Sequence, residues 1–438
     1  MVSAARVVDV GRVLEAAEAA SPVQAVEAAA RELGTVFGAA AVSFLIADLS
    51  GRALVRLAHV PLAGGRRDAR QPLAPGERRS GEESGTVLPF DGGVAEQAVR
   101  TQRAQVLDPQ HPHPGDGPSG HWQVLAPVTE RGESIGLLEL SLPHEPDADT
   151  VSEIERVAHL FAFVVIANRR HTDLFEWGQR SSSFSLAAEI QQRLLPGSRT
   201  CEAAAFTLSG WLEPAATIGG DTFDYSLGRD VLDLSLTDAM GHGVGAALMA
   251  SMCLGSLRGA RRSGATLLER AASTNAALVE QAGSRGLEDF VTGLLARLDL
   301  RTGSMQLVNA GHVAPYVARR SDVSVLDLPA DLPLGLFAET SYRETRLTLR
   351  PGDRVVLVTD GMLERNPAGT DLPTAIADTC SLHPREVVRA LADSALEATG
   401  HALSDDATVL CLDWHGAHDE DRSAVAGADS GRASAPLR

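Results

Sequence analysis

The 438-residue chain has no lysine, only four cysteines and 4% aromatic residues. Its 39 basic residues are therefore all arginines, against 57 acidic residues, and the formal net charge is −18. So acidic a chain is a poor electrostatic match for nucleic acid or anionic lipid. It fits a protein that acts on other proteins or on small molecules.

The four cysteines, Cys201, Cys253, Cys380 and Cys411, show no CxxC or other metal-binding spacing and suggest no disulfide framework. The N-terminus lacks the basic start and apolar core of a secretory signal peptide. The longest apolar run, "LFAFVVIA" at 160–167, is far shorter than the roughly 20 residues of a spanning helix. We therefore expect a cytoplasmic protein that does not enter a membrane.

The length of the chain exceeds that of one ordinary hydrophobic core, and both helical and alternating apolar patterns occur along it. We predict an α/β (α+β) protein with more than one domain. The last 24 residues lack apolar periodicity and are rich in Ala, Gly, Ser and charge, as in disordered tails. The expected parts are a first domain over 1–172, a helical linker over 173–197, a second domain over 198–414 and a disordered tail over 415–438.

The first domain reads as a helix over 11–38, a hairpin around "DLSG", a short helix, a second hairpin and a long helix that begins at "DT". This order, over about residues 10–172, resembles a GAF domain, a small α/β sensor fold. The absence of cysteine from the region disfavours a thioether-linked bilin as its ligand. Several histidines could be imagined as haem or metal ligands, but we interpret them as solvated loop residues: His59, His111, His113, His121 and His144.

The linker contains "SFSLAAEIQQRLLPG", in which Leu186, Ile190 and Leu194 recur every four residues and predict one apolar face of a helix. Pro196 and Gly197 end the pattern. Two interpretations remain open: a simple spacer, or a helix that carries a signal and pairs two chains into a homodimer.

Acidic motifs punctuate the second domain. "TIGGDTFDYSLGRD" places Asp221 at the entry to a hairpin, and "LSLTDAMGHG" places Asp238 at the end of a strand. "VVLVTDGMLE" repeats this arrangement with Asp360, and "SDDATVLCLDW" places Asp405 and Asp406 just before a strand. One such aspartate would be ordinary turn chemistry. Four motifs at strand ends are typical of a shared site at the edge of a sheet.

Carboxylates that are crowded at one edge repel each other unless a cation neutralises them. Oxygen ligands without Cys or His favour Mn²⁺ or Mg²⁺ over zinc. The set suffices for two ions about 3.5–4 Å apart, a pair that can activate water and clamp the oxygens of a phosphoryl group. The residues therefore indicate metal-dependent chemistry on a phosphate ester.

The ordered motifs GGDxxD, DxxGHGxxAA, NAGH, TDG and DDAT resemble the SpoIIE/RsbU branch of the metal-dependent (PPM, type 2C) serine/threonine phosphatases over about residues 198–414. The resemblance implies an α-β-β-α sandwich that hydrolyses phosphoserine or phosphothreonine on a partner protein. In that branch the partner is often a STAS-domain antagonist of an anti-sigma factor. The resemblance also implies the catalytic metal ligands: Asp221, Asp238 with the carbonyl of Ala239, Asp360 and Asp405.

Other motif residues keep more than one interpretation. Asp406 could replace Asp405 as a ligand, although the family pattern puts the ligand first in the pair. Asp224 could at most support a metal ligand and is not expected to bind the metal itself. His242 is more typical of a turn than of a proton donor, and contact of His312 with substrate is an open guess. The resemblance further implies that helices flanking the site control metal occupancy, so a GAF signal could reach the site through the linker.

Three rival functions fit the motifs less well. A diguanylate cyclase should carry an acidic residue where "GGDTF" has Thr222, and it would leave "TDG" and "DDAT" unexplained. "DAMGHGVG" resembles the ATP lid of GHKL kinases, but the upstream helical Asn and the phosphoacceptor His of such kinases are not in place. A catalytically silent scaffold would not need an intact acidic set.

Overall fold

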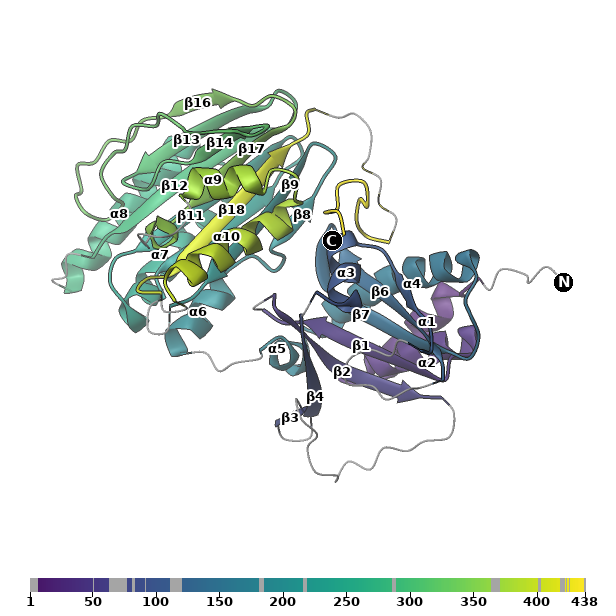
Figure 1. Cartoon of the computed structure of the whole chain (residues 1–438). Helices are drawn as coiled ribbons and strands as arrows, with labels where there is room; N and C mark the ends of the chain where they lie inside the picture. The colour runs from purple at the N-terminus through teal and green to yellow at the C-terminus, as the bar shows by residue number, and fades with distance from the viewer. Residues whose placement is uncertain are drawn as a thin grey trace. The chain divides into compact units, whose positions relative to one another are not determined.

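The computed structural model divides the chain into two compact units, Met1–Ser183 with Ser423–Arg438, and Phe184–Arg422 (Figure 1). Each unit is described by itself. None of the helices in the described part of the chain is long and apolar enough to cross a membrane. The structure describes residues 7–49, 51–62, 77–80, 83–90, 92–110, 120–180, 185–215, 219–285, 289–363, 371–400, 403–417, 422, 424 and 426–436.

The first unit is built on a seven-stranded antiparallel sheet with the order β3-β4-β2-β1-β7-β6-β5. Its strands are β1 Ala41–Ala47, β2 Ala53–Pro61, β3 Glu77–Ser80, β4 Glu83–Pro89, β5 Gln105–Leu107, β6 Trp122–Glu130 and β7 Glu133–Leu142. Its helices are α1 Val10–Ala19, α2 Ala25–Phe37, α3 Val94–Thr101, α4 Ala148–Asn168 and α5 Leu174–Gly178. The element order agrees with the expected helix–hairpin–helix–hairpin–helix pattern except in two places: β3 and β4 add a hairpin before α3, and the first helix is divided.

Alternation along the central strand β1 distributes its side chains between two cores. Phe44 joins a cluster with residues of α1, α2 and α4, and its ring stacks on Phe161 of α4 at a centroid distance of 6.5 Å. Leu45 points to the opposite face and joins a smaller cluster with α3. The side chain of Asp147 accepts a hydrogen bond from Thr150 N at 2.8 Å, so the long helix begins at the predicted cap.

The single helix expected over 11–38 is instead two helices, α1 and α2. Helix α1 ends at Ala19, and Pro22 lies in the connection before α2. Proline has no N–H to donate and its ring clashes with the preceding turn, so a helix does not run through it.

The helix expected within the linker is present, but its buried face differs from the predicted one. Helix α6 (Leu186–Leu194) begins with Ser185 as its cap, and its buried residues are Ala187, Ala188 and Gln191. Leu186, expected on the apolar face, is 65% exposed. A Cβ on Gly219 would lie 2.9 Å from the Cβ of Ala187, so small residues let the helix approach the second unit's backbone.

The second unit contains two antiparallel sheets, ordered β10-β11-β12-β13-β16 and β15-β14-β17-β18-β9-β8. The strands are β8 Thr200–Glu202, β9 Phe206–Glu213, β10 Asp221–Leu227, β11 Val231–Ala239, β12 Val291–Asp299, β13 Ser304–Ala310, β14 Tyr316–Arg319, β15 Asp322–Val325, β16 Thr345–Thr348, β17 Asp353–Val358 and β18 Ala407–Trp414. The helices are α7 Gly243–Arg262, α8 Leu267–Arg285, α9 Leu372–Asp378 and α10 Pro384–Ala398, with the 3-10 turn η1 Asp360–Leu363.

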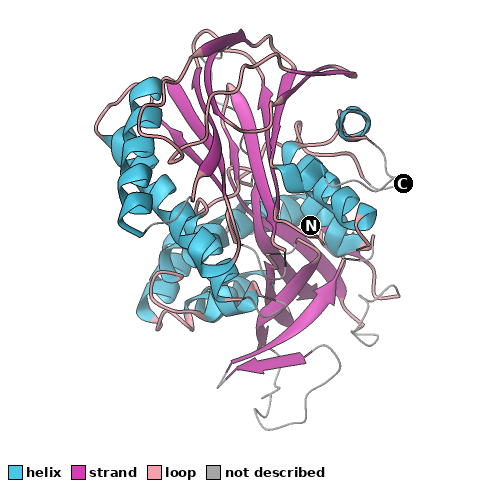
Figure 2. Cartoon of the chain, turned by 90° about the vertical axis from the view of Figure 1, so that its left-hand side faces the viewer, coloured by secondary structure: helices cyan, strands magenta, loops and turns pink. Residues whose placement is uncertain are grey.

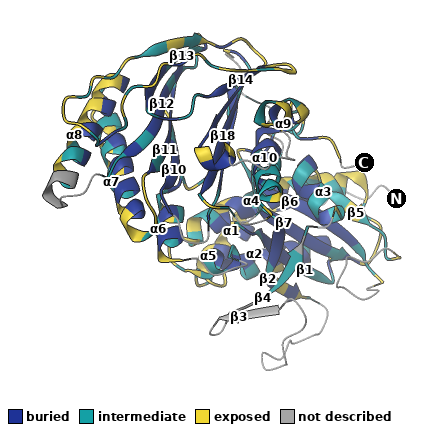
Figure 3. Cartoon of the chain, turned by 60° about the vertical axis from the view of Figure 1, so that its left-hand side comes forward, coloured by how far each residue is buried: buried dark blue, intermediate teal, exposed yellow. Residues whose placement is uncertain are grey.

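One core lies between the two sheets, and each sheet packs helices on its other face. Residues of α7 and α8 cluster with the five-stranded sheet, and residues of α9 and α10 cluster with the six-stranded sheet. Figure 2 shows the strands between flanking helices, and Figure 3 shows that the central strands β11, β12 and β18 are mainly buried. The expected α-β-β-α sandwich is therefore confirmed.

The two sheets meet closely at Phe223 of β10, which is fully buried between them. A Cβ on Gly210 of β9 would lie 2.5 Å from the Phe223 ring, so the glycine makes room for the aromatic side chain. Strand β11 alternates in the same way: Leu234 faces the inter-sheet core, whereas Asp233 pairs with Arg270 of α8 at 2.7 Å.

The expectation of a disordered tail over 415–438 is wrong for residues 426–436. These residues belong to the first unit, where Gly132 N donates to Gly427 O at 3.1 Å and Ala428 is 2% exposed. The small side chains of this segment let it lie close to the surface that it covers. They form no apolar pattern, so the sequence does not reveal this packing.

Replacing Phe223 by alanine should lower the free energy of unfolding of the second unit by about 3–5 kcal/mol, because it leaves a cavity between the sheets. Phe337→Ala, at a side chain that is 55% exposed, is the matched control and should change it by less than about 0.5 kcal/mol. Urea unfolding followed by far-ultraviolet circular dichroism measures both. Equal effects of the two substitutions would contradict this view of the core.

Candidate functional site

The acidic motifs occupy adjacent strand ends within each sheet. Asp221, the first residue of β10, pairs directly with Asp238 near the end of β11. In the other sheet, Val358 at the end of β17 pairs with Val409 near the start of β18. Antiparallel pairing therefore brings Asp360, which follows β17, to the same edge as the Asp405–Asp406 pair that precedes β18.

Two threonines join these two edges into one site. Thr359 Oγ1 and Thr408 Oγ1, from the six-stranded sheet, both donate to Asp221 Oδ2, at 2.7 and 2.5 Å. Thr408 N donates in turn to Thr359 Oγ1 at 2.9 Å. Because Asp221 begins a strand of the five-stranded sheet, these bonds hold the motifs of both sheets around one buried carboxylate.

The electrostatics of the site call for a cation. Burial, then the charges of Asp238 and Asp406, hold the pKa of Asp221 well above its usual range, against the two threonine hydroxyls that lower it. Burial, then Asp360, Asp405 and Asp406, raises the pKa of Asp238 to about 7. Among the described residues, the groups that shift these two pKa values include no basic side chain. A divalent cation fits this set of oxygen donors.

The described side chains do not form a complete metal-binding site in their present positions. Within the described ranges, no three His, Cys, Asp or Glu side chains are grouped closely enough to hold a metal ion as they lie. Mutual repulsion keeps such carboxylates apart, and a cation would draw them inward. The donor chemistry fits a metal, whereas the individual ligands stay an assignment that we propose below.

The pair Asp405–Asp406 separates into two roles. Asp406 is 1% exposed, and its carboxylate accepts from Ala215 N at 2.8 Å and from Gly220 N at 3.2 Å. Asp405 is partly exposed and accepts from Asp406 N at 2.8 Å. The carboxylate of Asp406 is thus engaged by the backbone amides of Ala215 and Gly220, which favours Asp405 as the ligand.

Gln191 of α6 was missed in the sequence analysis. Its side chain is fully buried, and Nε2 donates both to Asp221 O at 2.9 Å and to Asp406 Oδ2 at 2.6 Å. In the sequence, Gln191 stands next to Gln192 in an amphipathic helix, where both polar side chains would be expected in solvent. The spacing of the residues gives no sign that Gln191 is the buried one of the two. One amide nitrogen thereby connects the linker helix to two of the acidic motifs.

Asp224 lies outside the acidic cluster. Its carboxylate pairs with Arg258 at 2.7 Å and with Arg261 at 2.8 Å, both on α7. Arg258 also donates to Leu194 O at the end of α6, at 2.8 Å. The residue therefore fastens α7 and α6 to β10 instead of supporting a ligand directly.

The loop "NAGH" is closed on itself. Asn309 Oδ1 accepts from His312 N at 2.7 Å, and Asn309 Nδ2 donates to His312 O at 3.0 Å. His312 is 7% exposed, its Nδ1 is bonded to Thr292 Oγ1 at 2.8 Å, and burial lowers its pKa to about 4. A buried neutral imidazole positions the loop and is poorly placed for the substrate contact that was guessed.

His242 is exposed and stands at the N-cap of α7 without a side-chain capping bond. The flanking Gly241 and Gly243 have φ of 97° and 70°, in the left-handed region that favours glycine. The turn after Asp238 therefore requires these two glycines, as the turn interpretation of His242 implies.

The histidines of the first unit do not assemble a metal site within the described part of the chain. His59 Nδ1 is bonded to Ser43 Oγ at 2.9 Å, and His144 is exposed. His111 and His113 lie outside the described residues.

Comparisons with known proteins agree with this geometry. The family model "Stage II sporulation protein E (SpoIIE)" matches residues 228–415, and the GAF domain model matches residues 21–167. The second unit is a SpoIIE-type protein serine/threonine phosphatase domain. The first is a GAF domain. Asp221 precedes the residues matched by the SpoIIE model, so its place in the site rests on the geometry described above.

This GAF-domain phosphatase is similar to the phosphoserine phosphatase RsbU of Bacillus subtilis, with 27% identity over 237 residues, 53% of this chain and 70% of that protein. A structure of RsbU and RsbW domains from Mycobacterium tuberculosis is 25% identical, with a TM-score of 0.43, over 49% of this chain and 63% of that one. The phosphatase domain of SpoIIE from Bacillus subtilis is 19% identical, with a TM-score of 0.42, over 52% and 66%. This chain thus spans about two thirds of each.

Replacing Gln191 by alanine should raise the Mn²⁺ concentration needed for half-maximal hydrolysis of p-nitrophenyl phosphate by roughly tenfold. A buried carboxylate and a buried carbonyl would each lose a donor, a loss of about 1–3 kcal/mol. Gln192→Ala is the matched control, because Gln192 instead accepts from Arg199 Nη2. An unchanged Mn²⁺ titration of the Gln191 variant would show that α6 does not support the site.

Proposed function

We propose that this chain hydrolyses phosphoserine or phosphothreonine on a partner protein and that its GAF domain regulates the reaction. The observation that carries the proposal is the acidic site itself: Asp221 faces Asp238 across two paired strands, and Thr359 and Thr408 draw Asp221 to the motifs of the other sheet. Such a concentration of carboxylates suits the charge of two divalent cations and the phosphoryl group that they would clamp.

In this proposal two Mn²⁺ or Mg²⁺ ions are held by Asp221, Asp238, the carbonyl of Ala239, Asp360 and Asp405. The ions, when bound, supply Lewis-acid activation of water for attack on phosphorus. The chain's own residues orient the ligands. Thr359 and Thr408 fix Asp221 by their hydroxyls, and backbone amides engage the carboxylate of Asp406.

For the partner we propose a phosphorylated STAS-domain antagonist of an anti-sigma factor. The similar protein of Bacillus subtilis is named a phosphoserine phosphatase, and the similar structure from Mycobacterium tuberculosis contains an RsbW domain beside an RsbU domain. The net charge of −18 supports a protein partner over nucleic acid or an anionic membrane. We also propose a cytoplasmic location, because the four cysteines are free thiols, as a reducing compartment would keep them.

For regulation we propose that the GAF domain acts through α6. This helix lies next in the chain, and its Gln191 bonds to Asp221 O and Asp406 Oδ2. Its Leu186 is 65% exposed, a side chain that is available for pairing with a second chain in a homodimer. A shift of α6 would change the donors around the acidic site and with them its affinity for metal.

Asp238→Asn and Asp360→Asn should each reduce hydrolysis of p-nitrophenyl phosphate in Mn²⁺ by at least about 100-fold, because each substitution removes one negative charge from the site. Asp322→Asn, at an exposed carboxylate in β15, is the matched control and should keep wild-type turnover. Full activity in both site variants would refute the two-ion assignment. A wild-type protein without turnover on any phosphoprotein, with Mn²⁺ bound, would instead point to a silent scaffold.

A shortened chain that begins at Pro196 lacks α6 and Gln191. We expect it to need more Mn²⁺ than the full chain for the same turnover and to lose any response to a GAF ligand. Isothermal titration with Mn²⁺ and the p-nitrophenyl phosphate assay measure the two effects. If the shortened chain binds Mn²⁺ as tightly and turns over as fast as the full chain, α6 does not carry the signal.

A further inference from the structure

A short segment near the C-terminus forms part of the GAF unit. Residues 426–436 pack into this unit although the whole phosphatase unit separates them from it in the sequence. Ala428 and Ser434 are 2% and 3% exposed, although neither lies in a helix or a sheet strand. Side chains in irregular backbone reach such burial when the segment fits closely against a surface.

The surface is formed by the turn between β6 and β7 and by α3. Gly132 N, in the turn, donates to Gly427 O at 3.1 Å. Arg100 Nε, in α3, donates to Ala435 O at 2.9 Å. The segment is thus hydrogen-bonded to the GAF unit near both of its ends, through its backbone carbonyls.

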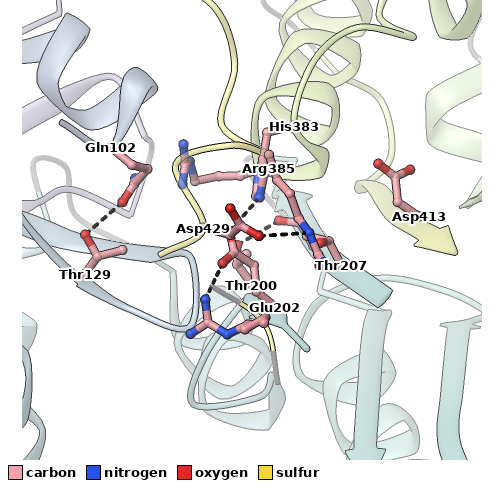
Figure 4. A network of polar contacts seen from close by, with 12 residues as sticks. Gln102, Thr129, Thr200, Glu202, Thr207, His383, Arg385, Asp413 and Asp429 are labelled. Carbon is pink, nitrogen blue, oxygen red and sulfur yellow. Dashed lines mark hydrogen bonds and ion pairs between the residues drawn. The ribbon is translucent and has the colours of Figure 1, made fainter. Parts of the chain in front are cut away.

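The underlying surface is itself held in place. Thr129 Oγ1 donates to Gln102 Oε1 at 2.8 Å, a bond that Figure 4 shows, and Thr129 O is bonded to His159 Nδ1 of α4 at 2.6 Å. Gln102 Nε2 donates to Val99 O at 2.7 Å. These bonds connect α3, β6 and α4 beneath the segment.

Gly427 is the point of closest approach. A Cβ there would lie 2.1 Å from Thr129 O and 2.4 Å from His159 Nδ1, and its φ of 86° is in the left-handed region. Both the contact and the backbone conformation therefore require glycine. The segment around Gly427 therefore packs against the GAF unit in one specific position.

Just before this segment, Arg422 is anchored in the phosphatase unit. Its Nη1 pairs at 2.7 Å with Glu202 Oε2, a carboxylate that is 1% exposed. Glu202 Oε1 lies 3.0 Å from Nε2 of His383, whose Nδ1 accepts from Arg385 N, so Nε2 carries the proton and donates. Burial lowers the pKa of His383, and Arg422 supplies positive charge next to Glu202.

We propose that the described residues Arg422, Ala424 and 426–436 form a strap that runs from the end of the phosphatase unit to a docking surface on the GAF unit. Arg422 is its anchor on one side, and the segment around Gly427 is its anchor on the other. The occupant of the docking surface is this chain's own segment.

Hydrogen–deuterium exchange of the full-length protein tests the strap. Gly427→Ala should make the amides of 426–436 and of 129–132 exchange at least tenfold faster, because the added Cβ has no room. Gly431→Ala, the same substitution in the same segment, should stay within twofold of the wild type, since its Cβ would contact only the Asp429 side chain at 3.2 Å. Basal hydrolysis of p-nitrophenyl phosphate should stay within twofold in both variants.

Two results would overturn the proposal. Wild-type exchange at 129–132 in the Gly427→Ala protein would mean that the segment is not docked there. Conversion of a dimer to a monomer on deletion of 423–438, measured by sedimentation, would mean that the docked segment comes from a second copy. An unchanged oligomeric state together with faster exchange at 129–132 in the deletion supports docking within one chain.

Discussion

The repulsion between Asp221 and Asp238 is the constraint on which the rest of the phosphatase unit depends. Strand pairing fixes the two carboxylates opposite each other, and burial denies them the water that would screen their charges. Everything around them limits the resulting penalty. Thr359 and Thr408 donate to one carboxylate, and the remaining negative charge is left for a cation.

That constraint explains why the acidic motifs come from two sheets. A single sheet edge would place them in a row, whereas two facing edges surround a small volume from both sides. The sandwich must then hold its sheets in a fixed register, and the inter-sheet core with Phe223 against Gly210 does so. Packing at Phe223, close to Asp221 in the same strand, thus helps to set the spacing of the carboxylates.

Much of this arrangement was predictable from the sequence. Asp238 lies near the end of a strand with alternating apolar residues, and Asp360 follows a continuously apolar strand. A glycine comes shortly after each aspartate, so local propensity and turn chemistry determine both patterns. The order of the motifs carried the resemblance to the phosphatases, and the sandwich followed from it. In the GAF domain, the hairpins and the capped long helix were equally local features.

What could not be predicted depends on tertiary contacts. Gln191 differs from its neighbour Gln192 only in which side of α6 meets the sheet, and the buried face of that helix follows Ala187 instead of Leu186. The roles of Asp405 and Asp406 were separated by which backbone amides reach Asp406. The position of the C-terminal segment could not be predicted either. The segment fits because Gly427 has no side chain, and a single glycine leaves no apolar pattern in the sequence.

The docked position of residues 426–436 has a consequence for synthesis. The GAF unit consists of two separate segments of the chain, and the phosphatase unit lies between them in the sequence. A ribosome that has finished the N-terminal piece has not yet made the residues that cover the turn between β6 and β7. Of the two described units, the one that begins earlier in the chain is therefore completed later, and a product that stops before residue 426 would leave the turn between β6 and β7 uncovered.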